Sequence, residues 1–114
     1  MDAKILAAIL DSIGSPILFV DNNHIIQYLN KPAQVRFYEK LGYGDLIGKS
    51  VFDCHNPASN EGIKGLYGRF LAGENEIFVH IINNRTKLTA IAVRDPHGKL
   101  LGYYERYEKV AATP

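Results

Sequence analysis

The chain has 114 residues, 46% of them hydrophobic, which is enough for one compact domain and too few for two ordinary ones. Thirteen Lys and Arg against twelve Asp and Glu leave a formal net charge of +1, which argues against direct binding to nucleic acid or anionic lipid. One cysteine excludes an intramolecular disulfide, and no stretch approaches the roughly 18 apolar residues of a membrane span, so we expect a cytoplasmic protein.

The first predicted element is an amphipathic helix that ends near Gly14. Its apolar stripe, with spacings of one and four residues, contains Ile5, Leu6, Ile9 and Leu10. Such a stripe specifies burial but not the surface that buries it. The helix packs either on the sheet of its own domain or against another chain.

Two short strands and a short helix follow. β-Branched and aromatic residues dominate 17–21 and 24–30, and Asn22-Asn23 between these runs suits a tight hairpin turn. Lys31-Pro32 favours a helix start, which predicts a short helix over 31–44.

The longest interior helix is expected over residues 59–74. Ser59 is the predicted N-cap, and Gly73 is the predicted end. The helix follows FDCHNPAS, residues 52–59, which holds the only cysteine and one of the four histidines. This segment is the corner where the sequence concentrates its chemistry.

Three strands end the chain. They are expected over 76–84, 87–95 and 100–110, with polar turns between them. The predicted order is therefore a helix, two strands, a helical middle and three antiparallel strands.

This order, with three sequence segments, resembles a PAS domain. The segments are ILFVDNNHIIQYLN, DLIGKSVFD and AVRDPHGKLLGYYERYEKV, and the match covers residues 12–110. The resemblance implies an α+β fold, with a five-stranded antiparallel sheet of order 2-1-5-4-3, helices over one face and a pocket between the two layers. It divides the chain into a flanking helix at 1–14, the PAS domain at 15–110 and a tail at 111–114.

The resemblance also implies a sensor or relay for signal transduction and not an enzyme. Flanking helices of such domains commonly dimerise, so a homodimer is expected through Ile5, Leu6, Ile9 and Leu10. The sequence has no nucleophile elbow and no phosphate-binding glycine loop, which agrees with a domain that does not catalyse. No effector domain or signalling partner is evident in these residues.

The FDCHNPAS corner is similar to an Asp-Cys-His-Pro-Pro corner found in a subgroup of PAS domains. It is also similar in position to the histidine corner of haem-binding PAS domains in carbon-monoxide-responsive regulators. This likeness implies His55 as an axial ligand of haem iron, with Cys54 beside it. Those regulators supply cysteine or methionine as a second ligand, which this chain lacks beyond Cys54 and Met1. Without a C-x-x-C-H motif the haem would be of the b type.

A histidine ligand needs its second ring nitrogen oriented by a neighbour, and Asp53 and Asn56 are the candidates in the sequence. Cys54 and His55 diverge by about 100° in a helix or 180° in a strand, so they are not expected to bind one iron together.

Small residues mark two expected walls of the pocket. Gly62, Gly65 and Gly68 recur every three residues in the predicted helix, where each costs about 1 kcal/mol relative to alanine. They would form a ledge for a flat ligand or for close helix–sheet packing. Ala90 and Ala92 share one face of a strand, which either widens the pocket or faces solvent.

The other histidines and nearby cations carry weaker predictions. His80 lies mid-strand, where it either faces the pocket or occupies an exposed cross-strand position. His24 and His97 fall in predicted turns and are expected to be exposed. Lys64 and Arg69 are candidate partners for haem propionates or part of a solvated helix face.

Two functions remain open. The first is a haem-based sensor of a diatomic gas or of redox state. The second is a PAS module without haem, which binds a small organic ligand or serves in dimerisation and signal relay. Structural zinc is disfavoured because one cysteine and four scattered histidines offer no close ligand pair.

Overall fold

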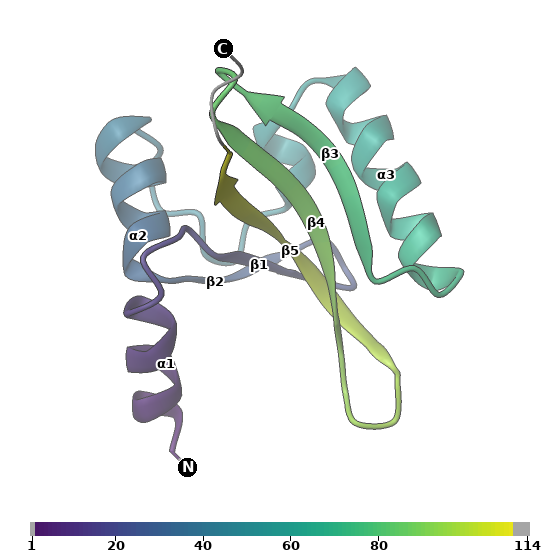
Figure 1. Cartoon of the computed structure of the whole chain (residues 1–114), viewed down its shortest axis with the longest axis horizontal. Coiled ribbons are helices and arrows are strands. Elements are labelled where there is room, and N and C mark those ends of the chain that lie inside the picture. Colours follow the sequence, from purple (N-terminus) through teal and green to yellow (C-terminus); the bar gives the residue numbers. More distant parts are fainter. Residues whose placement is uncertain (1, 111–114) are drawn as a thin grey trace.

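The computed structural model describes residues 2–110, apart from the side chain of Cys54. Five antiparallel strands form one sheet in the order β2-β1-β5-β4-β3, which confirms the predicted α+β fold and strand order (Figure 1). The strands are β1 (Leu18–Asp21), β2 (Ile26–Leu29), β3 (Glu76–Ile82), β4 (Thr86–Arg94) and β5 (Leu100–Lys109). The predicted tail at 111–114 lies outside the described residues.

The N-terminal helix α1 (Ala3–Asp11) extends away from the sheet (Figure 1). Asp2 caps it by accepting a hydrogen bond of 2.9 Å from the backbone N–H of Ile5. None of its residues is buried, so the apolar stripe predicted from the sequence does not pack on the sheet.

Asn30, which is fully buried, connects α1 to the rest of the domain. Its side-chain N–H groups donate to the carbonyl oxygens of Leu10 and Ser15, each at 2.9 Å. Its carbonyl oxygen accepts from the backbone N–H groups of Ile17 at 2.9 Å and Ala33 at 3.0 Å. One buried amide therefore links α1, the start of the domain and the next helix.

The helix predicted over 31–44 is shorter and divided. Helix α2 (Lys31–Gln34) begins at the Asn30 cap and passes directly into a π-helical segment (Val35–Lys40). A π segment holds an extra residue per turn and is frequent at functional sites. Periodicity does not reveal this change, because six residues are too few to distinguish the repeat of a π-helix from that of an α-helix.

A 3₁₀ helix (Val51–Cys54) leads into the long helix α3 (Pro57–Leu71). The prediction of Ser59 as N-cap was wrong, because Asn56 caps α3 by accepting a 2.8 Å hydrogen bond from the Ser59 N–H. Pro57 then occupies the first helical turn, where its missing N–H costs nothing.

The core lies between the inner face of the sheet and the helical layer. Its most buried side chains include Phe70 of α3, Ile26 of β2 and Ile77 of β3. At Gly102 of β5 a Cβ atom would lie 2.1 Å from the Val20 carbonyl oxygen, so β1 and β5 approach too closely for a larger residue there. Within residues 2–110 no helix is long and apolar enough to cross a bilayer.

Candidate functional site

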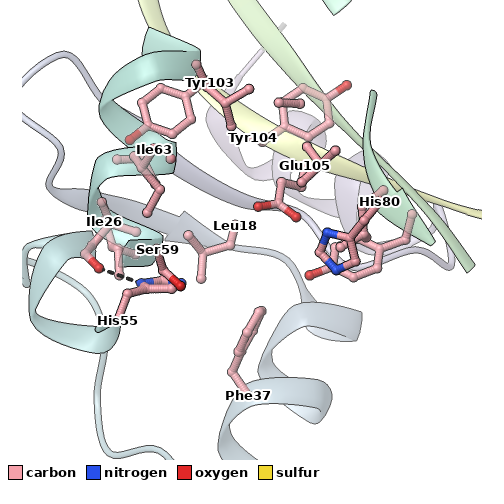
Figure 2. A pocket seen from close by; sticks show the side chains of 18 of the residues that line it. Leu18, Ile26, Phe37, His55, Ser59, Ile63, His80, Tyr103, Tyr104 and Glu105 are labelled. Carbon is pink, nitrogen blue, oxygen red and sulfur yellow. Dashed lines mark hydrogen bonds between the residues drawn. The ribbon is translucent and has the colours of Figure 1, made fainter. Parts of the chain in front are cut away.

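A cavity of about 620 Å³ lies between the inner face of the sheet and the helical layer. Strands β1 to β5 form one wall, and the π segment, the FDCHNPAS corner and α3 form the other (Figure 2). Most of the lining is aliphatic or aromatic. The ionisable and polar groups on it are Arg36, Tyr43, His55, Ser59, His80, Tyr103, Tyr104, Glu105 and Tyr107.

His55 follows the 3₁₀ helix and lines this cavity. Its Nδ1 atom lies 2.8 Å from the backbone carbonyl oxygen of Val51 (Figure 2). A carbonyl oxygen only accepts, so Nδ1 carries the proton and Nε2 of the neutral ring keeps a free lone pair. The orienting partner is thus Val51, and neither Asp53 nor Asn56 fills the role that the sequence suggested.

The glycines and alanines predicted for the pocket walls divide into two groups. Gly62 and Ala90 line the cavity, and Ala90 is buried at 1% exposure. Gly65 and Ala92 are not among the lining residues. The predicted ledge therefore reaches the cavity at Gly62 alone, because α3 rotates its later glycines away.

A Cβ atom at Gly62, Gly65 or Gly68 would meet no heavy atom within 4 Å, so none of these glycines is required by close packing. Cys54, the other predicted residue of the corner, lies in the 3₁₀ helix, and its side chain is outside the described part of the structure.

His80 reaches the cavity through an irregularity of β3. Ile77 pairs with Ala90 on the inner face, but the register shifts after Phe78, so that His80 pairs with Leu88. This bulge places two residues of β3 opposite one of β4 and brings His80 to the rim of the cavity, where the residue is exposed. Strict alternation from Ile77 would have turned His80 outward.

Glu105 is a site residue that the sequence analysis missed. It lies on the inner face of β5 opposite Ala90, and its carboxyl group points into the cavity between His55 and His80 (Figure 2). Burial raises the pKa of Glu105, and the neighbouring His80, His55 and Arg36 partly offset that effect. The alternation Tyr103, Glu105, Tyr107 was the available signal, since it puts one carboxylate in phase with two inward aromatic residues.

Arg36 of the π segment was also missed. Its guanidinium carbon lies 5.1 Å from the ring centroid of Tyr107 and 5.9 Å from that of Phe37. Its Nε atom is buried, and among the described residues it has neither a hydrogen-bond partner nor an ion pair. Lys64 and Arg69, the cations proposed from the sequence, do not line the cavity and pair on the surface with Glu61 and Glu74.

His24 is not exposed as its turn position had suggested. Its Nδ1 atom lies 2.8 Å from the Tyr103 hydroxyl, and its ring centroid is 4.8 Å from Phe52 and 4.7 Å from Tyr67. Burial lowers the pKa of His24. It is therefore a packing residue that joins the first hairpin to the corner, whereas His97 is exposed in its turn.

The sequence and the fold match one family and several solved structures. A family model described as PAS fold matches residues 10–113. A C-terminal domain from Streptococcus mutans is similar with a TM-score of 0.80 and 20% identity, covering 96% of this chain and 85% of that chain. A PAS domain from Colwellia psychrerythraea has a TM-score of 0.66 and 16% identity, covering 94% and 95%.

A third similar structure is that of the Aer2 receptor from Vibrio cholerae, described as a dual PAS-haem oxygen sensor. Its TM-score is 0.53 at 23% identity, and the match covers 85% of this chain and 95% of that chain. Likeness at these identities shows the fold alone. No curated protein matches the sequence.

Proposed function

Since the chain belongs to the PAS family and is a sensory and signalling domain, we propose that its cavity binds haem b and senses a diatomic gas or redox state. The observation that carries this proposal is the orientation of His55. Its Nδ1–H donates to Val51, which leaves Nε2 as the atom available to a metal on a side chain that lines the cavity. This backbone-supported tautomer is the usual arrangement of a histidine that binds iron.

The other walls of the cavity suit a flat, mostly apolar group. The lining is dominated by aliphatic and aromatic side chains, and Gly62 on α3 presents no side chain. Arg36 would face an anionic substituent such as a propionate, a role that Lys64 and Arg69 do not fill. When bound, haem supplies an iron that coordinates a diatomic gas or changes its redox state.

His80 and Glu105 line the sheet side of the cavity. Cys54 is the last residue of the 3₁₀ helix, directly before His55. His80 is our candidate for the sixth coordination position or for a hydrogen bond to a bound diatomic, in place of the cysteine or methionine of related regulators.

A second candidate is a small organic ligand in the same cavity without iron. The ionisable groups favour it, because Arg36 and Glu105 face a space of about 620 Å³ that is otherwise largely apolar. Pockets of this kind take ligands with an apolar body and a few polar groups that fix their orientation.

We also propose that the domain forms a homodimer through α1. Ile5, Leu6 and Ile9 of the predicted contact set are 51%, 47% and 47% exposed, whereas Leu10 is half-buried and its carbonyl oxygen binds Asn30. Ile13, just beyond the helix, extends the exposed stripe at 51%. A second copy of the same stripe would cover these side chains.

A contiguous set of contacts leads from the cavity to α1. Arg36 and Phe37 line the cavity, their π segment continues from α2, and Asn30 caps α2 while it holds the end of α1. A ligand that changes the position of the π segment would therefore act on the proposed dimer contact, provided that it binds two states of the domain with different affinity.

The test is an absorption spectrum after haem addition and desalting, in the oxidised, reduced and carbon-monoxide-treated forms. Wild type is expected to keep one haem per chain with a Soret band. His55→Ala should lose or change this band, whereas His97→Ala, an exposed histidine away from the cavity, should keep it. Failure of wild type to retain haem would overturn the haem proposal and leave the organic ligand.

A further inference from the structure

Arg36 brings a permanent positive charge to the wall of an otherwise apolar cavity. A guanidinium remains protonated in proteins, so it cannot avoid the cost of burial by losing its proton. Its Nε–H is buried and has no acceptor among the described residues. The aromatic faces of Tyr107 and Phe37 offset part of the charge, and the Tyr107 hydroxyl that interacts with Arg36 is a neutral acceptor. The group therefore lacks an anionic partner.

Glu105 does not supply that partner. It makes no ion pair within 4.0 Å in the described part of the chain, although it lies close enough to Arg36 for the two charges to interact. Its carboxyl group also faces His80 of β3 and His55 of the corner, with Tyr107 two residues along the same strand face. A protonated carboxyl group would donate one hydrogen bond into the cavity.

We infer that the cavity takes a ligand with an apolar body and one carboxylate directed at Arg36. The inference rests on the proposed use of the cavity as a ligand site, and it names the chemistry of the ligand. A carboxylate matches the geometry of a guanidinium with two parallel hydrogen bonds.

Other ligand classes fit less well. A cation would meet Arg36 in a space of low polarity, and a single group with two negative charges, such as a phosphate monoester, would have one compensating guanidinium. No three His, Cys, Asp or Glu side chains gather to hold a bare metal ion in the described residues. Two sources share the favoured chemistry, namely a haem propionate and a simple fatty or aryl carboxylate.

The experiment compares octanoate with 1-octanol by calorimetric titration at pH 7. Wild type is expected to bind octanoate about tenfold more tightly or better, which is the scale of one charge-assisted hydrogen bond. Arg36→Met should remove this preference and leave 1-octanol binding within about twofold. Arg85→Met, on the exposed β3–β4 turn, should match wild type. Equal binding of the two probes to wild type, or binding of neither, overturns the inference.

Comparison of wild type with Arg36→Met requires both proteins to be folded. The preference of wild type for octanoate over 1-octanol decides the ligand class without the variant.

Haem and its dimethyl ester distinguish this inference from the haem proposal. The ester keeps the iron and the apolar macrocycle but lacks the carboxylates. A preference for octanoate without haem retention supports the carboxylate site and rejects haem. Retention of haem and ester with equal affinity supports His55 ligation and rejects Arg36 as the carboxylate anchor.

Discussion

The Nδ1 atom of His55 lies 2.8 Å from the carbonyl oxygen of Val51, four residues earlier at the start of the 3₁₀ helix. The 3₁₀ helix turns that carbonyl toward the imidazole, and Asn56 begins α3 directly afterwards. The orientation of His55 therefore depends on the backbone of the corner and not on a replaceable side chain. This makes His55 itself the informative position for substitution.

Haem ligation by His55 is testable by rescue. His55→Gly should retain haem about tenfold less tightly or worse, with an altered Soret band, because the iron loses its protein ligand. Added imidazole occupies the vacated space and should restore the band. His97→Gly is the control and should respond to imidazole no more than wild type does. Loss of haem that imidazole does not restore would mean that His55 acts through folding and not through ligation.

The two alanines of β4 predict different effects of the same substitution. Ala90 lines the cavity, so Ala90→Leu should fill it and reduce haem or octanoate binding at least about tenfold with a small change in stability. Ala92 pairs with Tyr103 and packs against the core, so Ala92→Leu should cost about 1–3 kcal/mol of unfolding free energy by overpacking. Urea unfolding and ligand titration of both variants measure these effects. If the two substitutions have the same effects, Ala90 and Ala92 do not lie on different sides of the cavity wall.

The glycines of α3 separate helix propensity from ligand space. Gly65→Ala should raise the unfolding free energy by about 1 kcal/mol, because a Cβ there meets no atom within 4 Å and alanine favours the helix. Gly62→Ala should stabilise the empty domain similarly but weaken haem binding, because Gly62 lines the cavity. Urea unfolding and haem titration of both variants check this, and weaker haem binding by Gly65→Ala would restore the longer ledge predicted from sequence.

Much of the fold was accessible from the sequence because its signals are local. A strand, a turn such as Asn83-Asn84 and a capped helix start each depend on a few adjacent residues. The three segments that resemble a PAS domain indicated the order of these elements. The N-cap of α3 was misplaced by three residues, since Asn56 and Ser59 are both reasonable caps. The π segment was missed because its six residues are too few to show a repeat different from that of an α-helix.

The site was only partly predictable because it depends on contacts between distant segments. His55, Gly62 and Ala90 were identified from the corner and from the small residues. His80 reaches the cavity only because β3 carries a bulge. The alternation of apolar and polar residues in β3 does not reveal that bulge. Arg36 and Glu105 belong to different elements, and nothing local in either segment indicates that they face one space.

Glu105 makes stability dependent on pH in a defined direction. Burial raises its pKa above the ordinary 4.5, so the folded state holds the proton more tightly than the unfolded state. The stability contributed by that proton is complete below about pH 4.5 and is lost as pH rises through the folded-state pKa. The glutamine of Glu105→Gln cannot ionise. The unfolding free energy of this variant, relative to that of wild type, should therefore be higher at pH 7.5 than at pH 4. Urea unfolding at both values checks this, with exposed Glu39→Gln as the control. If the stability difference between Glu105→Gln and wild type is the same at both pH values, ionisation of Glu105 is not its cause.

The exposed stripe of α1 gives the last prediction, which concerns the proposed dimer. Ile9 is 47% exposed and none of α1 is buried, so Ile9→Asp should change the stability of a single domain by less than about 1 kcal/mol. At a contact between two copies, each aspartate would lie in an apolar interface and face its equivalent, so dimerisation should weaken by more than about tenfold.

Sedimentation equilibrium over a range of concentrations measures this association. Lys4→Asp places an aspartate on the side of α1 away from the stripe, where the side chain is also exposed, and should leave the association unchanged. A wild-type domain that stays monomeric, or equal weakening by both variants, would assign the stripe to something other than a second copy of this chain. Weakening by Ile9→Asp alone would assign the stripe to a contact between two copies of the domain.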